Sequence, residues 1–441
     1  MQTAATYYYQ QVATHGGYVY HYTPDLQVRW GEGRATPSQV WVQPPGTPTV
    51  GMAYLEAYRA TDDPFYLQAA TDAGLALIYG QLQSGGWTNM IEFDPLGDRV
   101  AQYRNGRGGG KNYSSLDDDQ TTAALRLMIA LDRAHQFQHP AIHESVTVAL
   151  EALLQAQFPN GGFPQVWDEP VPNRPVVPAR YPSHDWRDEG RVKNYWDMYT
   201  LNDNVTGNVA KTLAGAARVY DDPRYPVALQ QLGDFLCLAQ MPKPQRGWAQ
   251  QYNEAMEPIW ARKFEPPAIA GDETQEAVST LLSLTRFTGE PRFLEPIPEA
   301  MAWLQRVRLP DGQLARYYEL RTDRPLYMTR DGDRYSLTYD DSNLPSHYGW
   351  KTAARLDALA AEFEATKAGV AYPPLPSQAA LAEQASAVIQ SLDPQGRWLS
   401  RYDGQRLVGQ PKFAVGDPYL SSQVFADHLT KLSRYLRGLS R

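Results

Sequence analysis

The sequence contains only one cysteine, Cys237, among its 441 residues, which excludes an internal disulfide framework. It has no apolar run near the roughly 18 residues that a membrane span needs, so we expect no membrane-spanning segment and no membrane partner. The first residues show no basic and apolar signal segment. We therefore expect either a mature secreted or periplasmic protein whose leader has been removed, or a cytoplasmic protein.

An excess of positive charge is also missing. The net charge is −8 and charged residues make up 20% of the chain, so nothing favours nucleic acid as a partner. A protein of this charge that binds a polyanion needs local arginines or a bridging cation. Phenylalanine is scarce, at 12 residues, beside 11 Trp and 28 Tyr. Such rings either fill the seams between helices or line a groove that stacks on sugars.

What the sequence does contain is a repeated connector between helices. It occurs at residues 59–67, 218–225 and 286–294, and a looser copy has His139 before Pro140. In the three clear copies an acidic residue precedes proline and an aromatic residue follows the proline by two positions. An acidic N-cap followed by proline is a common way to begin a helix. The connector therefore predicts that helices follow one another in pairs.

Each predicted pair of helices closes on a glycine turn followed by a bulky residue. The five turns are Ser84-Gly85-Gly86-Trp87, Asn160-Gly161-Gly162-Phe163, Gln245-Arg246-Gly247-Trp248, Asp311-Gly312-Gln313-Leu314 and Pro394-Gln395-Gly396-Arg397-Trp398. This predicts five helical hairpins in an all-α dominated barrel or horseshoe, with short strands or loops after each turn. We expect one catalytic domain over residues 1–441, with a long loop inserted at about 167–194. Its last hairpin comprises residues 351–363 and 378–389.

Three long polar excursions mark the expected site, because function concentrates on connecting loops. They cover residues 94–120, 167–204 and 314–333. In the first, Asp117, Asp118 and Asp119 are a helix cap with solvated neighbours, a general acid and base, or Ca²⁺ ligands. In the second, Asn202 and Asp203 precede an apolar helical series, and helix capping is one interpretation of them.

Several motifs in this order resemble those of the family 10 polysaccharide lyases, the pectate (pectic acid) lyases. The resemblance covers about residues 41 to 350 and rests on Asn160-Gly161-Gly162-Phe163-Pro164-Gln165, Tyr199-Thr200-Leu201-Asn202-Asp203-Asn204, Ser115-Leu116-Asp117-Asp118, Trp260-Ala261-Arg262-Lys263-Phe264-Glu265-Pro266-Pro267, Leu314-Ala315-Arg316-Tyr317-Tyr318-Glu319-Leu320, Asp323-Arg324-Pro325 and Arg330-Asp331-Gly332. It implies an (α/α) toroid that cleaves α-1,4-linked polygalacturonate, or a related uronan, by β-elimination to 4,5-unsaturated products.

The resemblance also implies roles for particular residues. Arg262 is the expected base, and substrate contacts are expected from Arg316, Arg330, Lys111, Asn202 and Tyr199. Asp117 and Asp203 are the expected ligands of a Ca²⁺ cofactor, since hard cations take carboxylate oxygens. Arginine suits the bidentate binding of carboxylates. As a base it needs a pKa far below its usual value, which predicts activity that rises at alkaline pH.

The sequence departs from the family pattern in two places. Asp118-Asp119 stands where the family has Asn-Gly, which adds charge. The 167–194 loop is much longer than the usual link and carries six basic or imidazole side chains. They are Arg174, Arg180, His184, Arg187, Arg191 and Lys193. This loop either shapes the substrate groove or is a surface flap.

Other functions stay open on the sequence alone. A glycoside hydrolase of the same fold would need two carboxylates flanking one bond, and no clear Glu partner for Asp117 appears. A terpene-cyclase-like enzyme is suggested by the turn at residues 83–87, but the polar loops favour a charged sugar. A uronan-binding protein without catalysis is the non-enzyme alternative. The oligomeric state is not predicted.

Overall fold

The computed structural model describes residues 1–189 and 191–439. The described chain is a succession of α-helices, α1 to α12, joined by loops and short strands. It divides into two compact units. Unit 1 comprises Met1–Leu153 with Leu375–Arg441, and unit 2 comprises Leu154–Pro374.

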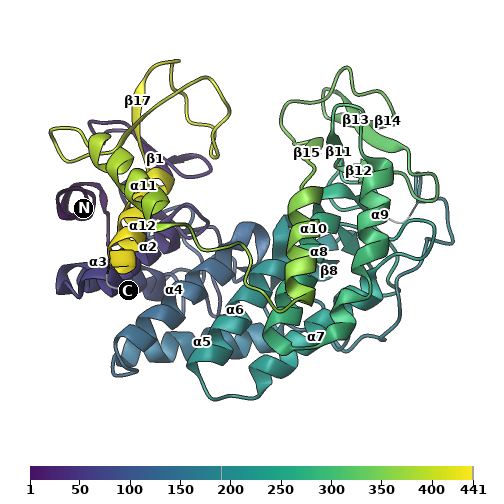
Figure 1. The fold of residues 1–441 in the computed structure, drawn as a ribbon, viewed down its shortest axis with the longest axis horizontal. Coiled ribbons are helices and arrows are strands. Elements are labelled where there is room, and N and C mark those ends of the chain that lie inside the picture. The colour runs from purple at the N-terminus through teal and green to yellow at the C-terminus, as the bar shows by residue number, and fades with distance from the viewer. Residues whose placement is uncertain (190, 440–441) are drawn as a thin grey trace. The chain divides into compact units, whose positions relative to one another are not determined.

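Unit 1 combines helices from both ends of the chain. Its helices are α1 (Gln2–Tyr7), a π-helical turn (Tyr8–Val12), α2 (Thr47–Thr61), α3 (Pro64–Tyr79), α4 (Gln120–Ala134), α5 (Pro140–Gln155, which runs past the unit boundary), α11 (Gln378–Gln390) and α12 (Ser422–Leu439). Although α12 and α2 lie far apart in the sequence, they pack side by side (Figure 1). The two chain ends are therefore held in one core.

The strands of unit 1 are short and antiparallel. They are β1 (His21–Tyr22), β2 (Arg29–Trp30), β3 (Arg34–Ala35), β4 (Gln39–Trp41), β5 (Met90–Glu92), β6 (Ser114–Ser115), β16 (Leu399–Arg401) and β17 (Pro418–Ser421). Five of them form a sheet in the order β16-β17-β1-β2-β3, and β4 pairs with β5. His21 faces Ser421 in this sheet, so the strands also join the two ends of the chain.

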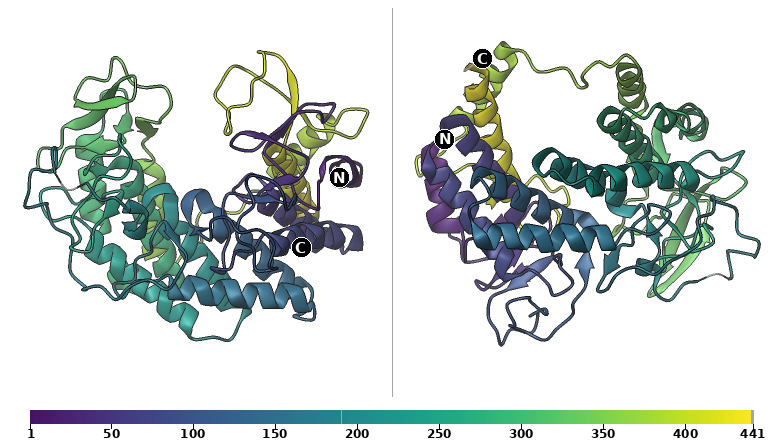
Figure 2. Two further views of the ribbon diagram at one scale, coloured as in Figure 1. Left: turned by 180° about the vertical axis from the view of Figure 1, so that it is seen from behind. Right: turned by 90° about the horizontal axis from the view of Figure 1, so that it is seen from below.

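Unit 2 has the same alternation of helices and short strands. Its helices are α6 (Val205–Val219), α7 (Arg224–Ala239), α8 (Gly271–Thr288), α9 (Ile297–Val307) and α10 (Leu356–Lys367). Its strands are β7 (Val166–Trp167), β8 (Tyr199–Thr200), β9 (Gln251–Tyr252), β10 (Ile269–Ala270), β11 (Gln313–Ala315), β12 (Tyr317–Tyr318), β13 (Pro325–Asp331), β14 (Arg334–Thr338) and β15 (Lys351–Ala353). The strands β11 to β15 gather at one end of α8, α9 and α10 (Figures 1 and 2).

The helix starts follow the predicted connectors. Asp63 is the N-cap of α3, where its side chain accepts a hydrogen bond from the N–H of Phe65. Proline opens α5 at Pro140 and a 3-10 turn at Pro291. One local prediction is wrong. Residues 351–353 are not helical, because they pair with β11 as a strand.

The glycine turns are confirmed, and there is one more than the sequence predicted. In each, a backbone N–H at the helix end bonds to the carbonyl just past the tip. These bonds are Leu82 to Gly86, Phe158 to Gly162, Met241 to Gly247, Leu309 to Gln313 and Asp393 to Arg397, and a tighter copy joins Thr14 to Gly17. The extra turn follows a helix that is short and partly π-helical, which hides its period in the sequence.

A glutamine at the start of three of these turns connects the turn to the helix after next, and two of the three, Gln81 and Gln240, are buried. The Nε2 of Gln81 donates to Gly85 O in its own turn at 2.7 Å and to Ser145 O in α5 at 2.9 Å. Gln157 and Gln240 repeat this arrangement, bonding to α7 and to the residue before α9. Each amide thus gives a donor to a carbonyl of its own turn and links that turn to a later helix or to the residue before it.

In the described part of the chain, no helix has the length and apolar content needed to cross a bilayer.

We expect Gln81→Ala to destabilise the protein by about 2 to 3 kcal/mol, because it removes two hydrogen bonds that the amide donates and one that it accepts from Arg104, and leaves Gly85 O without its partner. This corresponds to a fall in Tm of roughly 2 to 3 °C for a chain of this length, measurable by calorimetry. Gln83→Ala is the matched control, since Gln83 is exposed two residues away. Equal Tm values for the two variants would show that the amide does not stabilise the turn.

Candidate active site

The polar turn before α6 follows a short strand pair. β8 pairs with β9, and the chain then forms a single 3-10 turn, Asn202–Asn204. Asp203 and Asn204 have φ values of 54° and 55°, a left-handed region that short polar residues tolerate. Asn204 takes the N-cap position of α6, and its side chain makes no capping bond. The N-cap position of α6 thus falls one residue after the predicted pair, Asn202 and Asp203.

Arg316 connects this turn to the start of α8. Its Nη2 donates to Asn202 Oδ1 at 3.1 Å and lies 3.4 Å from Glu273 Oε1. The side chains of Arg316 and Glu273 are only 15% and 1% exposed. Burial lowers the pKa of Arg316, but the charge of Glu273 and neighbouring groups raises it more, so the net pKa lies well above its usual value. Arg316 is therefore a fixed cation.

Arg262 is held by the carboxylate three residues later. Glu265 accepts from Nη2 of Arg262 at 2.5 Å and from its backbone N–H at 2.9 Å. The Glu265 side chain is 2% exposed, whereas that of Arg262 is 45% exposed, so part of the guanidinium is open to a ligand. Burial lowers the pKa of Arg262, but its bond to Glu265 and the charge of Glu265 raise it above the ordinary value.

A chain of hydroxyl groups links the two arginines. Tyr317 donates to Gln250 Oε1 at 2.6 Å, the Tyr317 and Tyr348 hydroxyls lie 2.9 Å apart, and Tyr348 donates to Glu265 Oε1 at 2.8 Å. The guanidinium carbons of Arg316 and Arg262 lie 4.7 and 5.4 Å from the centre of the Tyr348 ring. Two cations are thus held over one aromatic ring, which is a favourable arrangement for each.

Arg262 also lines a pocket of about 660 Å³. One wall is its own turn, Ala261, Lys263 and Phe264, and another is Tyr335 of β14. The remaining wall comes from the end of the long loop, Arg191, Val192, Lys193 and Tyr195. The inserted segment therefore reaches the expected base.

The other expected substrate contacts lie in different surroundings. Arg330 is in β13 with its guanidinium carbon 5.6 Å from the ring centre of Tyr335, which lines the Arg262 pocket. Tyr199 is fully buried against Phe158 and Phe235, so its side chain packs the core and offers no surface to a ligand. Lys111 is exposed in unit 1, directly after the three glycines at 108–110.

Unit 1 carries a second copy of the strand, left-handed turn and helix. After β6, the 3-10 turn Asp117–Asp119 leads into α4, and Asp118 has a φ of 45°. By position in the turn, Asp118 corresponds to Asp203 and Asp117 to Asn202. Asp118 Oδ2 accepts from Gln43 Nε2 at 2.9 Å, and Asp119 forms a 2.5 Å ion pair with Arg126.

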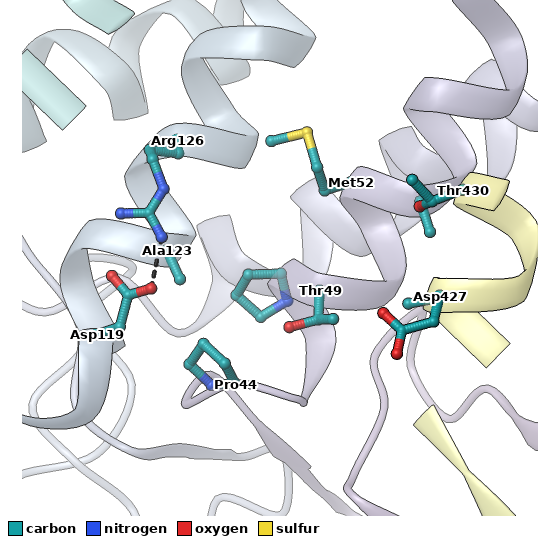
Figure 3. Close-up of a pocket in the computed structure, with 11 residues that line it drawn as sticks. Pro44, Thr49, Met52, Asp119, Ala123, Arg126, Asp427 and Thr430 are labelled. Carbon is teal, nitrogen blue, oxygen red and sulfur yellow. Dashed lines mark hydrogen bonds and ion pairs between the residues drawn. The ribbon is translucent and has the colours of Figure 1, made fainter. Parts of the chain in front are cut away.

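The Asp119 and Arg126 ion pair lines a pocket of about 280 Å³ within unit 1. Figure 3 shows Asp119, just before α4, and Arg126 of α4 on one side of the pocket, with Asp427 and Thr430 of α12 on the other side. Because Asp119 is engaged by Arg126, the extra charge of the Asp118-Asp119 pair is partly neutralised within the unit.

Whether Ca²⁺ fits these turns depends on how many oxygen ligands they offer. Ca²⁺ takes about six to eight oxygen ligands. Among the described residues there is no group of three or more His, Cys, Asp or Glu side chains arranged to hold a metal. The turns at Asp117 and Asp203 supply carboxylate and carbonyl oxygens of the right kind but too few to enclose the ion. Ca²⁺ fits here only if water and bound carboxylates complete its shell.

Sequence reasoning missed the partners that orient the arginines. Glu265 was noted only as part of a motif, although its spacing of three residues from Arg262 is that of a local ion pair. Glu273 and Gln250 gave no signal, because they approach Arg316 and Tyr317 from elements 43 and 67 residues away in the chain. Tyr348 contacts the hydroxyl of Tyr317 and donates to Glu265, so it also orders the polar groups.

A buried acid next to Glu273 makes the stability of the site depend on pH. Burial, then the charges of Glu273 and Asp272, raise the pKa of Glu276 to about 8. Between its ordinary pKa and about 8 the folded state keeps a proton that the unfolded state has lost. Stability therefore falls as pH rises through this range.

Replacing this acid by its amide should remove that dependence. We expect Glu276→Gln to raise Tm by a few degrees at pH 9, with the gain shrinking toward pH 5, as measured by thermal unfolding at several pH values. A gain that is the same at every pH would contradict the raised pKa.

Comparison with known proteins agrees with this architecture. The pectic acid lyase family model matches residues 81–315. A variant of a family 10 polysaccharide lyase from Cellvibrio cellulosa, solved in complex with trigalacturonic acid, is 18% identical, with 72% of this chain and 99% of that chain covered and a TM-score of 0.50. No curated protein matches the chain significantly.

A cellobiose 2-epimerase from Bacillus thermoamylovorans B4167 shares the fold over nearly the whole chain. It is 13% identical, with 98% of this chain and 95% of that chain covered and a TM-score of 0.50. Identities this low show the fold alone, and the expected all-α dominated (α/α) toroid is confirmed. The family match spans more than half of the chain. The chain therefore belongs to the pectic acid lyase family and is a pectate lyase-like polysaccharide lyase.

Proposed function

We propose that this enzyme cleaves α-1,4-linked polygalacturonate, or a closely related uronan, by β-elimination. The observation that carries the proposal is the pair of cations, Arg262 and Arg316, held over the ring of Tyr348 beside Asp203. Two fixed guanidinium groups suit a polymer that carries a carboxylate on every sugar. The complex of a family relative with trigalacturonic acid supports the same class of substrate.

The steps of β-elimination define the roles that the residues of the site have to fill. A base removes the C5 proton, the electron pair forms the C4–C5 double bond, and the bond from C4 to the O4 oxygen breaks. The leaving oxygen takes a proton. Negative charge builds on the substrate carboxylate as the C5 proton departs, and a nearby cation stabilises it. We assign this stabilising role to Arg316, which is buried and permanently charged.

Arg262 is the proposed base, and its partner opposes that role. A neutral guanidine is needed to accept the proton, whereas the ion pair with Glu265 favours the protonated form. We therefore propose that the pair with Glu265 weakens in the substrate complex before the proton is taken. Alkaline pH favours the same neutral form, so the rate should rise with pH.

Ca²⁺ is the proposed cofactor. Asp203 in unit 2 and Asp117 in unit 1 are each a proposed ligand, and at either turn substrate carboxylates and water would complete the oxygen shell. When bound, the ion supplies positive charge that neutralises substrate carboxylates. Because the substrate is a polymer found outside cells, we also propose that the enzyme is secreted or periplasmic.

A uronan-binding protein without catalysis is the second candidate. The strong ion pair between Arg262 and Glu265 favours it, since a guanidinium that never loses its proton binds carboxylates but does not act as a base. The two candidates differ in one product, the conjugated unsaturated uronate.

The deciding measurement is ultraviolet absorbance of that conjugated product, with polygalacturonate at alkaline pH. We expect a steady rise with Ca²⁺ that stops on adding chelator. Arg262→Lys and Arg262→Ala should each lower the rate at least about 100-fold, because a positioned base contributes about 10² to 10⁴. Arg133→Ala, at an exposed arginine of α4, is the control. Binding without any absorbance rise would favour the second candidate, and a normal rate in Arg262→Lys would exclude Arg262 as the base.

Glu265→Gln separates the two effects of the ion pair. Removing the negative charge lowers the pKa of Arg262, so the pH at which the rate rises should move down by about one unit or more. The amide keeps the size of the side chain and its ability to accept from Tyr348. An unchanged pH profile, with the variant folded, would show that the state of Arg262 does not limit the rate.

A further inference from the structure

The long loop of unit 2 is attached to its surroundings along its middle part. The N–H of Ala179 donates to Leu238 O at 2.8 Å, and that of Arg180 donates to Met256 O at 3.0 Å. The Tyr181 hydroxyl donates to Pro242 O at 3.0 Å. Backbone bonds to two separate segments hold this part of the loop in place, unlike a loosely attached flap.

A second set of contacts fixes the loop beside Arg262. The indole of Trp260 donates to Trp186 O at 2.7 Å, and Arg187 forms an ion pair with the buried Glu319. The guanidinium carbon of Arg191 then lies 4.5 Å from the ring centre of Trp260, two residues before Arg262. These contacts determine where the end of the loop lies relative to the proposed base.

The result is a pocket with one sign of charge. Four cationic side chains line it, Arg191 and Lys193 from the loop and Arg262 and Lys263 from the facing turn. None of the described residues lining it is acidic. Three aromatic rings, Tyr195, Phe264 and Tyr335, complete its walls.

Only one of these four cations is already neutralised. Arg262 is paired with Glu265, whereas no described carboxylate forms an ion pair with Arg191, Lys193 or Lys263. Like charges facing one cavity repel each other, and an anion bound between them relieves that repulsion. The aromatic rings add flat apolar surface of the kind that packs against the C–H face of a sugar.

We propose that Arg191 and Lys193 form an additional carboxylate subsite beside Arg262, which selects stretches of consecutive unesterified uronates. The proposal rests on the proposed function, because it takes the ligand of Arg262 to be a uronan. A guanidinium binds a carboxylate through two parallel N–H bonds, while a methyl ester of the same sugar has no charge to offer. The loop thus discriminates by charge, at a sugar next to the one that reacts.

The test compares charged and esterified ligands in a double variant, Arg191→Gln with Lys193→Gln. Binding of trigalacturonate and of its methyl ester is measured by calorimetry with Ca²⁺, in an Arg262→Lys background so that the ligand stays intact. We expect trigalacturonate to bind about 10- to 100-fold more weakly and with a smaller dependence on salt. Binding of the methyl ester should change less than about twofold.

The matched control is Lys211→Gln with Arg218→Gln, two exposed positions of α6 that carry the same loss of charge. We expect this control to bind both ligands normally. Equal weakening by the two double variants, or equal weakening for acid and ester, would overturn the proposal, because either result indicates only a long-range effect of net charge.

Kinetics with an intact Arg262 separate failure of this inference from failure of the proposed reaction. On polygalacturonate we expect the loop variant to raise KM about 10-fold or more and to leave kcat within about twofold. If the native protein binds trigalacturonate but forms no unsaturated product, the reaction is wrong, and the calorimetric comparison still decides the subsite. If it does not bind trigalacturonate, the subsite is wrong as well.

Discussion

The hydrogen bonds of the side-chain amides of Gln81, Gln157 and Gln240 are the interaction on which the rest of the architecture depends. A helical hairpin buries only one face by itself, and its glycine turn leaves carbonyl groups that water cannot reach. Each of these amides donates to one carbonyl in its own turn and to a second carbonyl further along the chain. The second carbonyl lies in α5 for Gln81, in α7 for Gln157 and just before α9 for Gln240. The same bonds that complete the turn therefore set the spacing of successive hairpins, and a hydrophobic contact, which has no direction, would not do so.

The position of the active-site residues follows from these turns. Trp248, just past its glycine, is buried and donates to Leu236 O in the preceding helix, while its backbone N–H donates to Thr274 Oγ1 in α8. This anchors the start of α8, where Glu273 meets Arg316. Trp87 makes the corresponding bonds, from its indole to Leu77 O and from its backbone N–H to Thr121 Oγ1. Thr121 lies in α4, two residues after the Asp117–Asp119 turn. Polar side chains that carry chemistry thus sit one or two residues from bonds that determine the scaffold.

Repetition explains which features the sequence could predict. Helical hairpins, acidic N-caps and glycine turns recur with fixed spacing, so each copy supports the others, and the arginines appear in recognisable motifs. The sixth turn at Gly16 was missed because the helix before it is partly π-helical. The ion pair of Arg316 with Glu273 and the hydroxyl chain through Tyr348 join segments far apart in the sequence. Nothing local marks such pairs, since their spacing is determined by tertiary packing.

Charge balance indicates what attracts a polyanion to a protein of net charge −8. Arg262 and Arg316 each face a buried glutamate, so the two pairs together contribute almost no net field. Their guanidinium groups fix the orientation of a carboxylate, but long-range attraction has to come from charges without a partner. In unit 2, Arg191 and Lys193 of the long loop and Lys263 are charges of this kind. Because such exposed charges are screened by salt while the buried pairs are not, affinity and turnover should respond differently to ionic strength. Under the proposals above, the loop governs capture of the polymer, and the two arginine–glutamate pairs govern the chemistry.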